Sequence, residues 1–411
     1  MTTLGVWDNG PRAKPLQDHL FDNIIFLACP AEINGQRVGD AVLSPGWQSY
    51  NHRHAYDTFD VTELVQEGQN AIGVITGEGW FSGRLGYGGG RRNIYGDTIG
   101  VISLLKINYQ NGTVQNIPSD ATWKSGYGPI VNSEIYDGQN LVGWVRLNVA
   151  GESGQDIRLV HTEVLENGEV ATRPLRQAKA TDTFILNGNG AQTLQPHFTF
   201  HGFRYVQVEG WPKGVPIDGD TMKAIVIYSD MERTGEIETS NTLLNKFHEN
   251  VRWSMKGNFL SIPTDYPQRD ERLGWTGDGH ASGPTANYLY DTAGFWRGWL
   301  KDVQSEQFES ERRVPPFVIP DWNENSASRR QPRSVWGHVV VAGPFDHYQS
   351  FGDLDMLREQ LPSAQAWLDT GISRDEVGLW NRTTGQFADW RVLIIMLLGV
   401  WRIGCMGLLL G

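Results

Sequence analysis

The sequence predicts a multidomain β + α protein, with two N-terminal β-sandwich-type domains followed by a helical domain. Three observations lead to this prediction. Short β-branched runs separated by Asn-Gly turns recur up to about residue 230. From about residue 235 the apolar residues change to a helical spacing. A length of 411 residues also leaves room for two to four domains, each with its own core.

The first predicted domain, residues 1–130, is a β-sandwich. Asn34-Gly35 and Asn111-Gly112 each lie between strand-like runs, and Asn-Gly is the strongest short signal of a β-hairpin. Leu43–Trp47 is also strand-like, with turn residues beside it. Residues 1–30 contain a loop-like stretch and one short apolar run, and they lack the clear strand pattern that follows.

The second predicted domain, residues 131–234, is a further β-sandwich. Gly143–Val149 alternates with period two, as a half-buried strand does. Asn167-Gly168 predicts a tight turn, and Phe198–Val208 predicts the last strand of the domain.

The third predicted domain, residues 235–390, is helical. Ser240 or Asn241 is suited to cap the first helix, because a short polar side chain can accept from the free backbone N–H groups there. Apolar residues then follow at helical spacing. They are Leu244, Phe247, Val251 and Met255. Further helices are predicted over residues 281–308, from Ser334, and over residues 353–368.

Composition limits the classes of partner. A net charge of −12 argues against nucleic acid, whose phosphates require clustered Lys and Arg. The two cysteines, Cys29 and Cys405, form neither a zinc motif nor a disulfide framework. The N-terminus lacks a charged start followed by an apolar core, so no signal peptide is predicted, and the localisation and oligomeric state stay open.

The chemistry is concentrated in residues 265–278, a predicted loop that leads into a helix. Gly274 and Gly277 break a regular helix there. Closely spaced carboxylates raise the pKa of at least one partner, which general acid chemistry needs. The four carboxylates are Asp265, Asp270, Glu271 and Asp278. The plainer alternative is a solvated acidic loop that pairs with its own arginines.

The stretch Pro-Gln-Arg-Asp-Glu-Arg-Leu-Gly-Trp-Thr-Gly-Asp resembles the signature loop of the α-L-rhamnosidases of glycoside hydrolase family 78. The resemblance implies that Glu271 is the general acid. It implies that Asp265 and Asp278 hold the hydroxyl groups of rhamnose, and that Trp275 is an aromatic wall of the sugar pocket. We expect these residues to converge on one concave site.

The resemblance extends from about Ala31 to Trp390 and implies an (α/α)6 barrel after a concanavalin-like domain. Trp336 and Trp390 lie where the family has pocket tryptophans, although helix packing would also explain them. His201 and Arg204 are interpreted as part of a hydrogen-bond set at a domain interface. No metal or organic cofactor is implied.

Two departures from the family pattern affect the expected function. His338 stands where the family has Asp after Trp-Gly, so the pocket wall is expected to differ. Residues 391–411 are almost wholly apolar and unlike the family. We interpret them as an aberrant tail of a truncated or frameshifted gene, after an incomplete barrel. A membrane span is disfavoured, because residues 392–401 form a run about half as long as the roughly 20 residues needed, although a helix extended to Leu410 is the alternative.

The expected function is therefore inverting hydrolysis that releases terminal α-L-rhamnose from glycosides. The aglycone and the linkage preference stay open. Inversion needs a second carboxylate as base, about 6.5–9.5 Å from the acid. The family takes that glutamate from later barrel helices, and none is assigned in this chain. The alternative is a non-catalytic carbohydrate-binding or inactive fragment.

Overall fold

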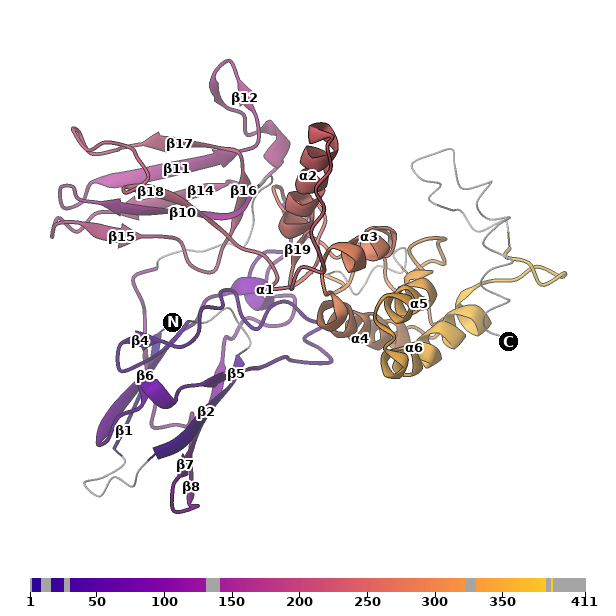
Figure 1. Cartoon of the computed structure of the whole chain (residues 1–411), viewed down its shortest axis with the longest axis horizontal. Helices are drawn as coiled ribbons and strands as arrows, with labels where there is room; N and C mark the ends of the chain where they lie inside the picture. The colour runs from indigo at the N-terminus through magenta and orange to yellow at the C-terminus, as the bar shows by residue number, and fades with distance from the viewer. Residues whose placement is uncertain are drawn as a thin grey trace. The chain divides into compact units, whose positions relative to one another are not determined.

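The computed structural model describes residues 2–8, 16–25, 30–130, 141–322, 330–381 and 386 (Figure 1). The chain divides into two compact units. The first unit comprises residues 1–274 and 289–295, and the second comprises residues 275–288 and 296–411. Among the described residues, no helix has both the length and the apolar character needed to cross a membrane.

Two sheets form the first sandwich of the first unit, in the strand orders β4-β3-β6-β1-β9 and β5-β2-β7-β8 (Figure 1). Apolar side chains from both sheets, among them Ile33, Ile72 and Leu105, share one buried core. The elements are β1 (Thr2–Asp8), β2 (Leu16–Ile25), β3 (Ala31–Ile33), β4 (Gln36–Arg37), β5 (Asp57–Asp60), η1 (Thr62–Leu64), β6 (Gln69–Ile75), α1 (Gly79–Ser82), β7 (Val101–Tyr109), β8 (Val114–Pro118) and β9 (Lys124–Gly126).

The two Asn-Gly hairpins predicted for this sandwich are confirmed. Asn34-Gly35 joins β3 to β4 with both residues at positive φ, 54° and 78°, as the tight hairpin turn requires. Asn111-Gly112 lies in the turn between β7 and β8. The stretch before residue 30, where no strand pattern was evident, supplies β1 and β2, which pair with β6 and β7.

The strand predicted at Leu43–Trp47 is wrong. Leu43 has a φ of 55°, and the segment is a loop. Trp47 is buried, its backbone N–H donates to Ser261 Oγ at 2.7 Å, and its Nε1 donates to Tyr95 Oη at 3.1 Å. These partners lie far away in sequence, so tertiary contacts override the local strand propensity here.

A second sandwich follows in the same unit. Its two main sheets run β15-β10-β16, with β18 also on β10, and β14-β11-β17. Side chains such as Leu147, Leu159 and Phe203 fill the core between them. The elements are β10 (Leu141–Val149), β11 (Asp156–Thr162), β12 (Leu165–Glu166), β13 (Glu169–Val170), η2 (Arg173–Leu175), β14 (Thr181–Ile185), β15 (Gln192–Leu194), β16 (His201–Phe203), β17 (Tyr205–Glu209) and β18 (Met222–Val226).

The predicted turn and strands of this sandwich are present, with one break. Asn167-Gly168 joins β12 to β13 at φ values of 55° and 85°. The single strand predicted over Phe198–Val208 is two strands, because β16 pairs with β10 whereas β17 pairs with β11. The chain changes sheets at Arg204, whose backbone N–H donates to Thr162 O at 2.9 Å. All strand pairs between named strands are antiparallel in the described residues, as a sandwich requires.

The predicted change to helices is confirmed. Helix α2 (Thr242–Asn258) begins at Asn241, whose side chain accepts from the N–H groups of Leu243 and Leu244. A short ribbon of β19 (Phe259–Leu260) and β20 (Ile262–Pro263) follows. Met255 is buried, but Leu244 and Phe247 of the predicted apolar stripe are 49% and 64% exposed. The stripe therefore predicted the helix better than it predicted the buried face.

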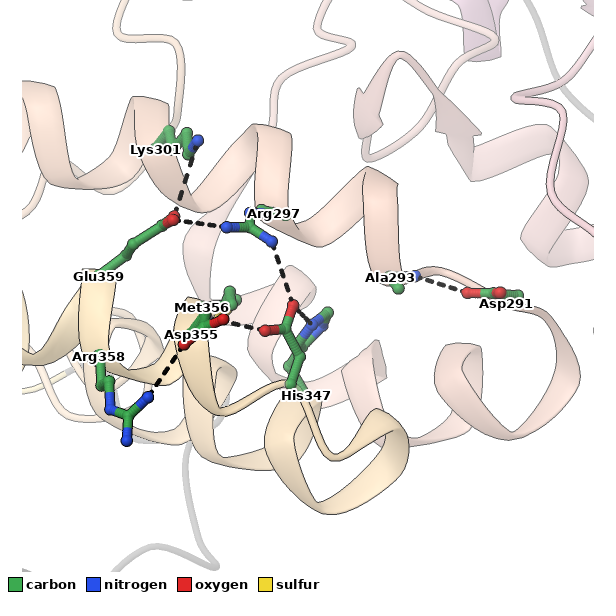
Figure 2. Close-up of polar contacts among 10 residues, drawn as sticks. Asp291, Ala293, Arg297, Lys301, His347, Asp355, Met356, Arg358 and Glu359 are labelled. Carbon is green, nitrogen blue, oxygen red and sulfur yellow. Dashed lines mark hydrogen bonds and ion pairs between the residues drawn. The ribbon is translucent and has the colours of Figure 1, made fainter.

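Four further helices follow, and residues 281–308 do not form the single helix predicted. The elements are α3 (Thr276–Leu289), α4 (Ala293–Glu309), α5 (Val339–Phe351), α6 (Leu354–Ala366) and the π-helical turn η4 (Trp367–Gly371). Residues 290–292 separate α3 from α4. There, Asp291 donates its N–H to Glu232 O at 2.7 Å, and its Oδ1 accepts from Ala293 N at 3.1 Å (Figure 2). Asp291 thus caps α4 and ends the preceding helix.

Polar contacts link α4 to α6 within the second unit. The Arg297 guanidinium is bonded to Glu359 (Figure 2). It also donates to Asp353 Oδ2 at 3.4 Å. Asp353 also caps α6, since its Oδ1 accepts from Met356 N at 2.9 Å. Arg297 and its two partners therefore hold α4 against α6, and Asp353 also fixes the start of α6.

Candidate active site

The loop of residues 265–274 lies in the first unit, and hydrogen bonds between Asp265 and Leu273 join its two ends. The Asp265 N–H donates to Leu273 O, and the Leu273 N–H donates to Asp265 Oδ1, both at 3.0 Å. Asp265 is 8% exposed. One of its carboxylate oxygens therefore serves the loop backbone, whatever else the side chain binds.

Glu271 is held by two arginines. Its Oε2 accepts from Arg269 Nη2 at 2.8 Å, from Arg269 Nε at 3.2 Å and from Arg176 Nη1 at 3.0 Å. The Glu271 side chain is 9% exposed. Charge-assisted bonds of this kind are short and directional, so they fix the carboxyl plane.

Two arginines of the signature loop, Arg269 and Arg272, are oriented by aromatic rings. The Arg269 guanidinium lies 3.6 Å from the centre of the Tyr266 ring. The Arg272 guanidinium lies 4.0 Å from the centre of the Phe200 ring and donates to Phe200 O at 3.0 Å. Planar guanidinium groups stack well on aromatic faces. The loop is thus built as a packed structure.

The plainer reading of a solvated acidic loop is half right. Arg269 does pair with Glu271, as that reading expected. However, Asp270 is 1% exposed, and its Oδ2 accepts from the Gly89 N–H of the first sandwich at 3.4 Å. The acidic groups of the loop in the first unit are therefore buried, and both sandwiches contribute groups that contact them.

The remainder of the signature lies in the second unit, at the start of α3. Gly277 does not break the helix as predicted; it belongs to the first turn of α3. Trp336 packs against it so closely that a Cβ at position 277 would lie 2.7 Å from Trp336 Cε2. Asp278 is exposed in the same turn, where a carboxylate stabilises the helix N-terminus.

The predicted site residues therefore fall into two groups. Asp265 and Glu271 belong to the first unit, whereas Trp275, Asp278 and Trp336 belong to the second. Their convergence on one concave site stays a prediction. Trp336 is 9% exposed, so its contact with Gly277 also fits the packing alternative. Trp390 and the tail 391–411 lie outside the described residues.

His338 packs against aromatic rings as an uncharged side chain. Burial, and then the charge of His280, lower the pKa of His338 to about 4. Its ring lies 6.3 Å from that of Trp367 and 5.7 Å from that of Trp380. Near neutral pH this side chain is therefore a neutral imidazole.

A second titratable cluster lies inside the second sandwich and was missed by the sequence analysis. His201 Nε2 bonds to Asp182 Oδ1 at 2.8 Å, and His161 Nε2 lies 3.9 Å from Asp182 Oδ2. All three side chains are buried. His161 Nδ1 bonds to Ala180 O at 3.0 Å. No local spacing signals the cluster, because its members come from three separate strands.

This cluster does not fit a metal ion, although three side chains of ligand type, two imidazoles and one carboxylate, meet in it. The His161 and His201 rings are stacked, with centres 4.2 Å apart and planes 22° apart. The lone pair of an imidazole lies in the ring plane, so stacked rings direct their lone pairs side by side and not toward one ion. His201 is part of a hydrogen-bond set, as interpreted from the sequence, but this set lies inside one sandwich and not at a domain interface. Arg204 is not part of that set: it is exposed and lies over the Tyr205 ring.

A small cavity lies in the second unit among α3, α4 and α5. It is lined by His280, Asn287, Leu300 and Asp346, together with three glycines and two tryptophans. Burial raises the pKa of Asp346 to about 6. None of the predicted site residues lines this cavity, although Gly279 and His280 of its lining directly follow Asp278 in α3.

Three family models match the chain and together extend over most of it. They describe an α-L-rhamnosidase N-terminal domain at residues 28–143, a bacterial α-L-rhamnosidase concanavalin-like domain at 133–228, and a bacterial α-L-rhamnosidase six-hairpin glycosidase domain at 232–395. This domain series agrees with the two sandwiches and the helices of the structure.

Individual proteins give the same result. An α-L-rhamnosidase of Streptomyces avermitilis is 34% identical over 92% of this chain and 42% of its own length. The solved native α-L-rhamnosidase of Aspergillus terreus has a TM-score of 0.90 and 48% identity, covering 94% of this chain and 52% of its own. The solved Streptomyces avermitilis α-L-rhamnosidase complexed with L-rhamnose has a TM-score of 0.81 and 33% identity, covering 89% and 41%.

These matches define the class as a glycosidase architecture with two β domains before a six-hairpin domain. The chain belongs to glycoside hydrolase family 78, the α-L-rhamnosidases. It spans about half, or less, of the length of the relatives that it matches.

Proposed function

We propose that the chain hydrolyses glycosides that end in α-L-rhamnose, with inversion, and that Glu271 is the general acid. The observation that carries the proposal is the fixed, buried carboxyl of Glu271 in the signature loop. Two arginines donate three N–H bonds to Oε2. In this proposal the proton is given from Oε1, and Oε1 faces the glycosidic oxygen.

The chemistry follows from the inverting mechanism. Glu271 gives its proton to the leaving oxygen as the bond to the anomeric carbon breaks, and a base removes a proton from the attacking water on the opposite face. No described residue is assigned as that base. Asp265 and Asp278 are proposed to bind the rhamnose hydroxyls. Trp275, Trp336 and Trp390 are proposed to contact its apolar side and methyl group.

The proposal draws on the relatives for its substrate. The Streptomyces avermitilis enzyme was solved with L-rhamnose, and this chain aligns with it over 89% of its length. Protonation and water attack need no metal or organic cofactor, so a chelator should leave hydrolysis unchanged.

A second candidate is a carbohydrate-binding protein that does not hydrolyse its ligand. The observation that keeps it open is that no residue in the described part of the chain is assigned as the base. A chain with the acid but without a base would hold rhamnose and leave water unactivated.

The two candidates are separated by measuring hydrolysis and binding on the same preparation. The purified chain is incubated with 4-nitrophenyl α-L-rhamnoside, and released nitrophenol is followed by absorbance. Titration with L-rhamnose in a calorimeter reports binding. Nitrophenol release above a Glu271→Gln control supports the hydrolase. Rhamnose binding without release supports the second candidate, and neither signal would contradict both.

A further inference from the structure

Arg176, on a loop of the second sandwich, makes a contact with the acid that the family signature does not contain. We propose that Arg176 is a positioning residue that sets the orientation of the Glu271 carboxyl from outside the signature loop. This inference rests on the proposed function, because it assigns Arg176 a role in proton donation. Arg176 and Glu271 both lie in the first unit, 95 positions apart in sequence.

The geometry at Oε2 requires two arginines for a fixed orientation. Arg269 is only two residues from Glu271 and bonds to Oε2 through Nε and Nη2. Arg269 and Glu271 lie on the same loop, so any shift of the loop moves both residues together. Arg269 alone therefore does not fix the carboxyl relative to the rest of the fold. Arg176 Nη1 adds a donor at 3.0 Å from a different domain. The second anchor therefore ties the acid to the β-sandwich.

The loop that carries Arg176 is built to hold this side chain in place. Arg176 has a φ of 55°, a region that side chains other than glycine seldom adopt, and its N–H bonds to Arg173 O. Leu175, Ala178 and Ala180 around it form a buried apolar cluster. The backbone is thus anchored, while the Arg176 side chain is 41% exposed.

The exposed fraction bears on what Arg176 contributes. The Arg176 guanidinium is two-fifths exposed, whereas its partners Glu271 and Asp270 are 9% and 1% exposed. The same guanidinium lies 3.7 Å from Asp270 Oδ1 as well as 3.0 Å from Glu271 Oε2. Because both carboxylates are buried, loss of this guanidinium would also lower stability, so only a loss of rate that depends on the leaving group supports positioning.

Leaving-group dependence provides the first test. A dinitrophenyl group departs as a stable anion and needs no proton, whereas a methylumbelliferyl or alkyl group needs the acid. Arg176→Ala should therefore lower kcat for the methylumbelliferyl rhamnoside by about 100-fold and change the dinitrophenyl rate by less than about 3-fold. Arg176→Lys should restore part of the loss, because it keeps a donor.

Arg173→Ala is the matched control. Arg173 lies in η2, close to Arg176, and its exposed guanidinium pairs with Glu166, not with the signature loop. It should leave both rates at the wild-type level. Equal losses on both substrates in Arg176→Ala would assign Arg176 a purely structural role and overturn the proposal.

Crystal structures of the wild type, Arg176→Ala and Arg173→Ala give a second readout that needs no turnover. The proposal expects the Glu271 side chain to change rotamer or to take several conformers in Arg176→Ala only. An unchanged Glu271 in that variant would contradict it. If the wild-type chain hydrolyses no rhamnoside, the proposed function fails for this chain, while the crystal structures still decide whether Arg176 orients Glu271.

Discussion

Glu271 and Asp182 are both buried carboxylates of the first unit, yet their surroundings differ in kind. Glu271 is held by arginines that are 20% and 41% exposed, on a loop where two sandwiches supply contacts. Asp182 lies between His161 and His201, which are 0% and 3% exposed, inside a single sandwich. Glu271 therefore lies beside partly exposed arginines, whereas Asp182 lies in a core among buried side chains.

The difference shows why a perturbed titratable cluster is not in itself an active site. Burial, and then the charge of His201, lower the pKa of His161 to about 3. Burial raises the pKa of Asp182, but the charge and hydrogen bond of His201 outweigh it, so that pKa lies below its ordinary value. Structural networks shift pKa values as strongly as catalytic ones do. Glu271 differs in its partners: its arginines are 20% and 41% exposed, whereas the histidines beside Asp182 are 0% and 3% exposed.

The largest expected effect separates the two carboxylates by turnover. Glu271→Gln removes the proton but keeps the shape, so hydrolysis of a methylumbelliferyl rhamnoside should fall by about 10²–10⁴-fold. Asp182→Asn, assayed well below its unfolding temperature, should stay within about 2-fold of the wild type. Loss of turnover in both variants would mean that the two sites are not distinct in function.

The second prediction reverses the ranking by measuring stability. Asp182→Ala leaves His201 buried without its partner, so the free energy of unfolding should fall by about 3–5 kcal/mol. Glu271→Gln should lower it by less than Asp182→Ala does, because an amide oxygen can still accept from the two arginines, which are 20% and 41% exposed. Urea unfolding of each variant, followed by far-UV circular dichroism, gives both values. A small loss in Asp182→Ala would contradict the structural role.

The third prediction concerns pH. Unfolded His161 takes up a proton below its ordinary pKa of 6.5, whereas the folded pKa is about 3. The unfolded state therefore binds more protons between these values, and stability falls as the pH falls through this window. Asp182, with its lowered pKa, acts in the same direction below its own ordinary pKa of 3.8.

The slope should be on the order of 1 kcal/mol per pH unit between about pH 6 and pH 4. Urea midpoints at several pH values measure it, and His161→Phe should flatten it. A slope that His161→Phe leaves unchanged would assign the acid sensitivity to other groups, such as His338 in the second unit.

The smallest expected loss of stability comes from an exposed helix cap, Asn241, which contrasts with the buried Asp182. Asn241→Ala removes the side chain that accepts from the Leu243 and Leu244 N–H groups at the start of α2. A lost N-cap costs about 1 kcal/mol. Asn241→Asp, which keeps an acceptor, should cost nearly nothing. Equal losses in the two variants would show that capping is not the reason.

Local chemistry explains what the sequence could predict. The turns at Asn34-Gly35 and Asn167-Gly168, and the cap at Asn241, depend on residues a few positions apart. The signature loop was recognisable because its residues are contiguous. The strand predicted at Leu43–Trp47 and the single helix predicted over residues 281–308 were wrong. Both segments are shaped by partners that are distant in sequence, Ser261 for Trp47 and Glu232 for Asp291.

The same reason accounts for the contacts that the sequence analysis missed. Arg176 reaches Glu271 across 95 positions, and His161 meets Asp182 and His201 only when three strands are packed. Neither contact leaves a spacing in the sequence. Family resemblance identified Glu271, but only the fold identifies which residues hold it.

The rate of Glu271→Gln across leaving groups tests the central claim most directly. Wild type and variant are compared on methylumbelliferyl and 2,4-dinitrophenyl α-L-rhamnosides at one pH. If Glu271 donates the proton, the variant should lose about 10²–10⁴-fold on the first substrate and less than about 10-fold on the second. Equal losses on both substrates, or none on either, would contradict the assignment of Glu271 as the general acid.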